Sequence, residues 1–149
     1  MTRTALTIVL LSALALTGCD DVLLFDVAPD GRILAPIDGR GRVTGLGDAA
    51  AARHLAVIDP VSGEATRYSR EPQVMSWPRW CGEAVTLVEA RTRLVLLGPD
   101  GSRRVLFETD RRLLQPTPSP RGDRVAVLEV ERPGLPGLLH VIDAATGRA

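Results

Sequence analysis

Few side chains in this sequence combine a reactive type with a context that would activate it. There are two cysteines, Cys19 and Cys81, and two histidines, His54 and His140. A thiol can be acylated, attack a substrate or bind a metal, and an imidazole can bind a metal or move a proton. The two histidines fall in separate predicted strands, and no cluster of metal-ligating residues surrounds either of them. We therefore interpret them as histidines on strand surfaces and predict no metal site.

The remaining candidates also lack partners for catalysis. Cys81 has no neighbouring pattern of His and Asn, which favours a buried or turn thiol over a nucleophile. Ser119 lacks the Gly-x-Ser-x-Gly frame of a hydrolase. Trp77 and Trp80 flank Pro78, and we expect them to pack over a turn rather than form a binding surface. The sequence thus predicts no enzyme activity and no cofactor.

Cys19 differs from Cys81 because an ordered targeting segment precedes it. Arg3 gives the first residues a positive charge, and residues 5–16 are almost all Ala, Leu, Ile and Val. This apolar run has the length of a signal-peptide core and is too short to cross a bilayer comfortably. It ends in Leu16-Thr17-Gly18-Cys19.

These residues resemble the lipobox of bacterial lipoproteins. The resemblance implies that residues 1–18 are a signal peptide, that cleavage precedes Cys19, and that the Cys19 thiol takes a diacylglycerol. The mature chain would be anchored to a bacterial membrane, facing the periplasm or the exterior. Asp20 and Asp21 resemble an inner-membrane retention signal of enteric bacteria. The alternatives are an ordinary secretory signal or a buried apolar helix with an incidental cysteine.

Composition limits the rest of the chain to one domain without a charge-driven partner. Of 149 residues, 45% are hydrophobic but only 3% are aromatic, so a core must rest on aliphatic side chains. Basic and acidic residues number 18 each, which gives no long-range attraction to nucleic acid.

Short apolar segments separated by Gly, Pro and Asp predict an all-β domain after the signal. No window shows the apolar spacing of an amphipathic helix. The predicted strands are residues 22–27, 32–37, 54–59, 64–68, 73–77, 84–89, 93–97, 103–108, 124–130 and 138–143. A turn is predicted over residues 78–82.

An internal repeat organises these strands. Residues 57–63 and 141–147 share Val, Ile, Asp and Gly at an offset of 84, which is two units of 42. A second turn signature recurs at Pro29 and Gly31, at Pro78 and Gly82, and at Pro120 and Gly122. A period near 42 with several strands per unit indicates β-propeller blades.

The clearest unit, residues 116–147, resembles the TolB-type propeller repeat. The pattern runs through Pro116, Ser119, Pro120 and Gly122, then Leu139, Asp143 and Gly147. The resemblance implies about three blades within residues 19–149 and mainly structural roles for the repeated turn residues. These are Pro29, Gly31, Asp59, Gly63, Pro78, Gly82, Ser119, Pro120, Gly122, Asp143 and Gly147.

Three blades are fewer than the usual minimum of four, and the last unit lacks an outer strand. An open set of sheets, an assembly of chains or a truncated gene would account for this, and we considered whether residues 22–27 pair beside the last unit. Exposed blade edges predict self-association.

We expect a lipid-anchored protein of the cell envelope that acts by contact with a still unidentified protein, without catalysis. The alternatives are the propeller remnant of a prolyl-oligopeptidase-like hydrolase that lacks its catalytic domain, or a small lipoprotein whose β-sheet only imitates a propeller.

Overall fold

Every regular element in the described part of the chain is a β-strand. The computed structural model describes residues 25–38, 40–41, 53–72, 75–132 and 135–149. It contains no helix there, and hence no helix long and apolar enough to cross a membrane. The strands are β1 (Asp26–Val27), β2 (Ile33–Ile37), β3 (His54–Ile58), β4 (Ala65–Arg67), β5 (Met75–Cys81), β6 (Ala84–Glu89), β7 (Arg93–Leu97), β8 (Arg103–Glu108), β9 (Arg112–Pro118), β10 (Arg124–Val130) and β11 (Leu138–Asp143).

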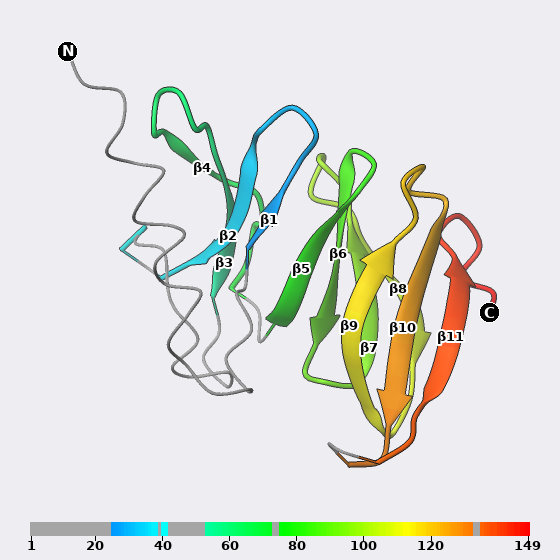
Figure 1. Cartoon of the computed structure of the whole chain (residues 1–149). Coiled ribbons are helices and arrows are strands. Elements are labelled where there is room, and N and C mark those ends of the chain that lie inside the picture. The colour runs from blue at the N-terminus through cyan, green and yellow to red at the C-terminus, as the bar shows by residue number, and fades with distance from the viewer. Residues whose placement is uncertain (1–24, 39, 42–52, 73–74, 133–134) are drawn as a thin grey trace.

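The strands form three antiparallel sheets that follow one another along the chain (Figure 1). The first sheet has the order β1-β2-β3-β4, the middle sheet β5-β6-β7-β8, and the last sheet β9-β10-β11. None of the three closes into a barrel. The prediction of an all-β chain with about three open, blade-like units is therefore confirmed.

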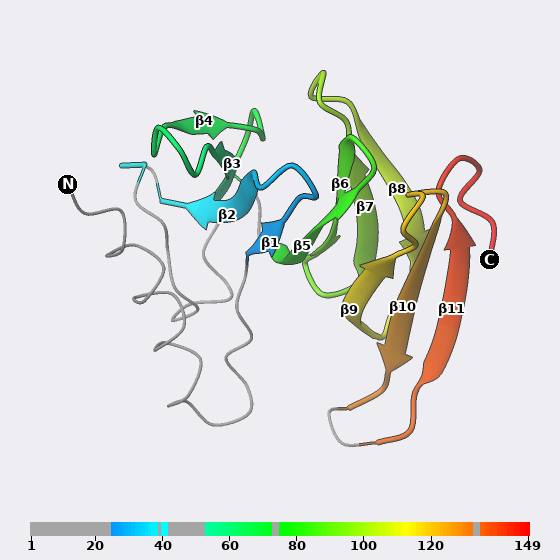
Figure 2. The same cartoon turned by 45° about the horizontal axis from the view of Figure 1, so that its top comes forward.

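The sheets stand side by side, with the middle sheet between the other two (Figures 1 and 2). Strand β5 contacts β1 and β2 of the first sheet and β9 of the last sheet. One apolar cluster joins the first and middle sheets, and its completely buried members include Leu34, Leu55 and Leu87. A second cluster joins the middle and last sheets through residues such as Leu94 and Val127. Alternation along β6 and β7 supplies aliphatic side chains to both clusters.

The predicted turn over residues 78–82 is wrong, because Pro78 to Cys81 continue strand β5. The turn is shorter: Cys81 pairs with Ala84, and Gly82 lies between them at a φ of 64°. Strand β9 was not predicted at all, since Pro116 and Pro118 in it indicate a loop.

Both errors have the same physical cause, which is a β-bulge beside a proline. The pairing register shifts between Ser76 and Arg79 in β5, where Trp77 has a φ of 49°. The pairing between β10 and β9 shifts in the same way between Ala126 and Leu128. The extra residue lies in β9, where Gln115 also has a φ of 49°. A bulge leaves a residue outside the ladder, so the missing N–H of the next proline breaks no hydrogen bond.

The described part of residues 22–27 does not pair beside the last sheet. Asp26 and Val27 form β1, which pairs with β2. They form the edge strand of the first sheet, so the hypothesis that this segment joins the two ends of the chain is wrong.

Candidate functional site

The repeated aspartates at residues 59 and 143 close two turns of the same geometry. Asp59 Oδ1 accepts hydrogen bonds from the N–H groups of Val61 and Ser62, at 2.7 and 2.9 Å. The Gly63 N–H donates to the Asp59 carbonyl at 2.8 Å, and Gly63 has a φ of 73°. These bonds use the carboxylate within its own turn.

Asp143 repeats this arrangement after β11. Its Oδ1 accepts from the N–H groups of Ala145 and Thr146 and from the Thr146 hydroxyl, at 2.7–3.0 Å. The Gly147 N–H donates to the Asp143 carbonyl at 2.8 Å. Hydrogen bonds from Ser62 and Val61 lower the pKa of Asp59, and those from Thr146 lower the pKa of Asp143.

The proline turns also share one backbone pattern. The Gly31 N–H donates to the Ala28 carbonyl, and the Gly122 N–H donates to the Ser119 carbonyl, each at 2.9 Å. Pro29 and Pro120 stand at the second position of these turns, where a fixed φ favours the bend. The Ser119 hydroxyl bonds the Asp123 carboxylate at 2.6 Å, which lowers the pKa of Asp123.

The turn glycines of the middle and last sheets meet at close range. A Cβ at Gly122 would lie 2.6 Å from the Gly82 nitrogen and 2.8 Å from the Cys81 carbonyl carbon. The Cys81 thiol donates to the Gly122 carbonyl at 3.3 Å. Burial, and then the Asp123 charge, raises the pKa of this thiol, so the reactive thiolate is disfavoured.

The tryptophans pack on opposite faces of β5. Trp80 belongs to the cluster under the first sheet and meets Tyr68 edge to face at a centroid distance of 6.0 Å. The Arg32 guanidinium carbon lies 5.0 Å from the centroid of the Trp80 ring. Trp77 packs against the other cluster.

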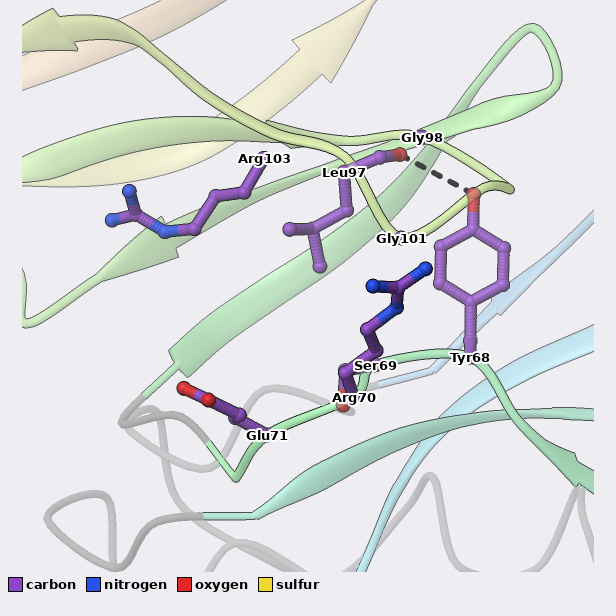
Figure 3. Close-up of a pocket in the computed structure, with 8 residues that line it drawn as sticks. All are labelled: Tyr68, Ser69, Arg70, Glu71, Leu97, Gly98, Gly101 and Arg103. Atoms are coloured by element: carbon purple, nitrogen blue, oxygen red, sulfur yellow. Dashed lines mark hydrogen bonds between the residues drawn. The ribbon is translucent and has the colours of Figure 1, made fainter.

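A hollow of about 210 Å³ lies where the chain passes from β4 toward the middle sheet. Figure 3 shows its lining residues, Tyr68, Ser69, Arg70, Glu71, Leu97, Gly98, Gly101 and Arg103. The Tyr68 hydroxyl contacts the Leu97 carbonyl at 3.3 Å, and burial and the Glu83 charge raise the Tyr68 pKa to about 12.

The two guanidinium groups of this hollow are already bonded. Arg70 donates to the Asp100 carbonyl at 2.9 Å, and Arg103 donates to the Glu89 carboxylate at 2.5 Å. The Arg70 bond links the segment that follows β4 to the middle sheet, and the Arg103 bond joins β8 to β6 within the middle sheet. Neither arginine is left as an open anion site.

A group of polar side chains surrounds Glu129, whose exposed fraction is 8%. Its carboxylate bonds His140 Nε2 at 2.6 Å and the Thr109 hydroxyl at 3.1 Å, and Arg111 Nε lies 3.7 Å away. The His140 ring also stacks on Phe107 at a centroid distance of 4.6 Å. In a catalytic triad, the hydroxyl nucleophile bonds the imidazole, and the imidazole bonds the carboxylate. Here the Thr109 hydroxyl bonds the Glu129 carboxylate directly, so the group does not have the arrangement of a triad.

Sequence reasoning missed this group. The available signal was a single Glu inside the apolar run of β10, at a position whose alternation places it with Val125 and Val127. An acid on a buried strand face needs partners, and only the fold brings Thr109 and His140 to it.

The two histidines lie in different sheets, His54 in β3 of the first and His140 in β11 of the last. The middle sheet separates them, so they do not form a pair (Figure 1). Within the described residues, no three His, Cys, Asp or Glu side chains gather in a metal-binding group.

The lipidation motif Leu16, Thr17, Gly18 and Cys19 lies outside the described residues, and its role stays a prediction.

No protein-family model, curated protein or solved structure matches this chain.

Proposed function

We propose that this protein is a lipid-anchored component of the bacterial cell envelope that acts by protein contact, without catalysis. The observation that carries the proposal is the order of residues before Cys19. A charged start and an apolar run end in Leu16-Thr17-Gly18-Cys19. Acyl chains on Cys19 would hold the β-domain at the outer surface of a membrane.

The environment of the polar side chains supports a contact role over an enzymatic one. The repeated aspartates bond their own turns, and Glu129 is bonded to His140 and Thr109. The Cys81 thiol is buried, and its pKa is raised. Each of these groups thus has a structural partner or, in the case of Cys81, a disfavoured thiolate.

We further propose that the β-domain is a TolB-like propeller fragment, and the repeated turns support this. Turns of one geometry close at Asp59 and Asp143, and each follows the third strand of its unit in chain order. This regularity agrees with propeller-type blades, whose loops would offer surfaces to a partner by analogy with the fold.

Fatty-acid labelling tests the anchor. The full-length chain, expressed in a bacterial host that is fed radioactive palmitate, is expected to carry label. Cys19→Ala should lose the label and leave the membrane fraction, whereas Cys81→Ala should keep both. Equal labelling of Cys19→Ala and the wild type would contradict the anchor.

Cross-linking tests the contact role. Cells expressing the chain are treated with a reagent that does not cross the cytoplasmic membrane, and the products are separated by mass. A discrete product larger than the chain is expected, and its absence in repeated experiments would count against a contact role.

A further inference from the structure

The last sheet has one face packed on the middle sheet, and none of the described sheets lies against its other face. Val125, Val127 and Ile142 point toward the middle sheet and are fully buried. Side chains alternate along a strand, so the residues between them point the opposite way. We name this opposite surface the outer face and define it by Leu114, Ala126, Leu128, Leu139 and Val141.

Strand register brings these five residues together. Leu128 is paired with Leu114 on one side and with Leu139 on the other, and Ala126 is paired with Val141. Directly opposite residues project from the same face of a sheet. The outer face is thus an aliphatic stripe that crosses all three strands, and Leu139 and Val141 on it are 69% and 48% exposed.

In the middle sheet, the positions equivalent to the outer face are covered by the last sheet. There Val88 is paired with Leu94 as Leu128 is with Leu139, and Thr86 is paired with Leu96 as Ala126 is with Val141. Val88 and Leu94 are fully buried under the last sheet, and Leu96 is packed against the same cluster.

The outer face therefore continues the pattern of an interface that already exists between the middle and last sheets. Its expected occupant is another β-sheet with aliphatic side chains.

A second copy of the chain could offer such a sheet at either end of its stack. At the first sheet, Ala35, Ile37 and Ala56 point away from the middle sheet but are at most 4% exposed. The described residues of that end therefore present no exposed aliphatic face. The outer face is the exposed aliphatic sheet face among the described residues, which leaves it to meet the same face of another copy.

We propose that two copies of this protein pair through their outer faces, sheet against sheet, around a two-fold axis. Such a contact uses one patch twice and closes at two copies, so it does not propagate into fibres. It deepens the proposed contact role by naming the partner, and it rests on the proposed membrane anchor for its strength.

The size of the face explains why the anchor matters. Three strands about 4.8 Å apart and seven residues long, at about 3.3 Å per residue, span roughly 300 Å². A stable interface buries about 800 Å² on each partner. The pair is therefore weak in dilute solution, and confinement of both copies to one membrane raises their effective concentration.

The test places thiols on and off the outer face in the full-length chain. Leu139→Cys puts a thiol on the face, and Val61→Cys puts one on a turn of the first sheet, at a residue that is 93% exposed. Isolated membranes are treated with a short bis-maleimide and analysed by denaturing electrophoresis. Leu139→Cys is expected to yield a product of twice the chain mass, and Val61→Cys is not.

A charge on the face provides the second arm. Val141→Arg, added to Leu139→Cys, should abolish the double-mass product, whereas Val61→Arg should leave it unchanged. Urea midpoints equal to that of Leu139→Cys would show that both variants remain folded. The palmitate label is measured on the same samples.

Several results would overturn the pairing. These are no double-mass product in labelled membranes, a product that survives Val141→Arg, or a product that joins the chain to a different polypeptide. Protection of Leu139→Cys from maleimide without any cross-link would assign the face to lipid instead. A double-mass product without palmitate label would refute the anchor and leave the pairing intact, and absence of both would refute the two proposals together.

Discussion

At the scale of single residues, the turn glycine Gly122 allows the last sheet to approach the middle sheet closely. Gly122 has a φ of 70°, and its α-carbon faces the backbone of Cys81 and Gly82. Gly63 has a φ of 73° but has no atom within 4 Å of an added Cβ. A substitution at Gly63 therefore tests the cost of the backbone conformation alone. A substitution at Gly122 tests this cost together with the cost of a clash between sheets.

Gly122→Ala is expected to be the more destabilising of the two substitutions. A non-glycine residue at positive φ costs about 1–3 kcal/mol, and Gly63→Ala should lose only this amount. Gly122→Ala adds a contact at 2.6 Å to backbone that cannot rotate away. Urea unfolding of both variants measures the difference, and equal losses would contradict the close packing of Gly122.

The turn carboxylates predict a pH dependence. The pKa of Asp143 is lowered from 3.8 by the Thr146 hydrogen bonds. Its stabilising effect is thus fully present above about pH 3.8 and is lost as pH falls through the lower pKa of the folded state. The difference in urea midpoint between wild type and Asp143→Asn should shrink over that acidic window. A difference that stays constant down to pH 2 would contradict this role.

At the scale of elements, the pairing of each strand decides whether its sequence can form a strand at all. Strand β9 contains two prolines, yet it pairs with β10 on one side and packs on β5. Strand β4 has three exposed residues and only β3 as a neighbour. Protection of a strand's amides from hydrogen exchange should depend on its neighbouring strands and its burial more than on the β-propensity of its residues.

Hydrogen exchange tests this order. Strand β6 has neighbours on both sides, and four of its six residues are buried. We expect its amides to exchange slowest, with β10 similar, and the amides of β4 to exchange fastest among the strands. Mass spectrometry of peptides from these strands provides the measurement. Equal exchange in β4 and β6 would contradict the sheet order.

At the scale of the whole molecule, the three sheets form a row (Figure 1), and the main interfaces among the described strands join the middle sheet to each of its two neighbours. Leu55 is fully buried between the first and middle sheets, and Leu113 is fully buried between the middle and last sheets. Stability in such an arrangement is close to a sum of terms for units and their interfaces. A change at one interface should loosen the nearer end of the row first.

Leu55→Ala and Leu113→Ala test this. Each removes a buried leucine side chain and should cost about 2–5 kcal/mol locally. Leu55→Ala should speed hydrogen exchange in β2 and β3 more than in β10, and Leu113→Ala should do the opposite. Identical exchange patterns in the two variants would show that the row unfolds only as a single unit.

Much of this architecture could be predicted from residue patterns. Strands β6, β7, β8, β10 and β11 have the predicted bounds, because clear aliphatic segments and Gly-containing turns delimit them. The β5 and β9 errors came from prolines, whose effect depends on a bulge that only the partner strand reveals. The Glu129 group, the Tyr68 hollow and the outer face likewise join residues that are far apart in the chain.

The sequence by itself determined the local chemistry: the apolar run of residues 5–16 before Cys19, the all-β character, and the turns closed by Asp59 and Asp143. These depend on side-chain type and on hydrogen bonds between near neighbours, which short segments encode. Only the tertiary structure decided that β1 belongs to the first sheet, that Cys81 is buried against Gly122, and that Leu139 and Val141 are left uncovered. Those outcomes depend on which sheet stacks on which, and burial between stacked sheets is a property of the whole row.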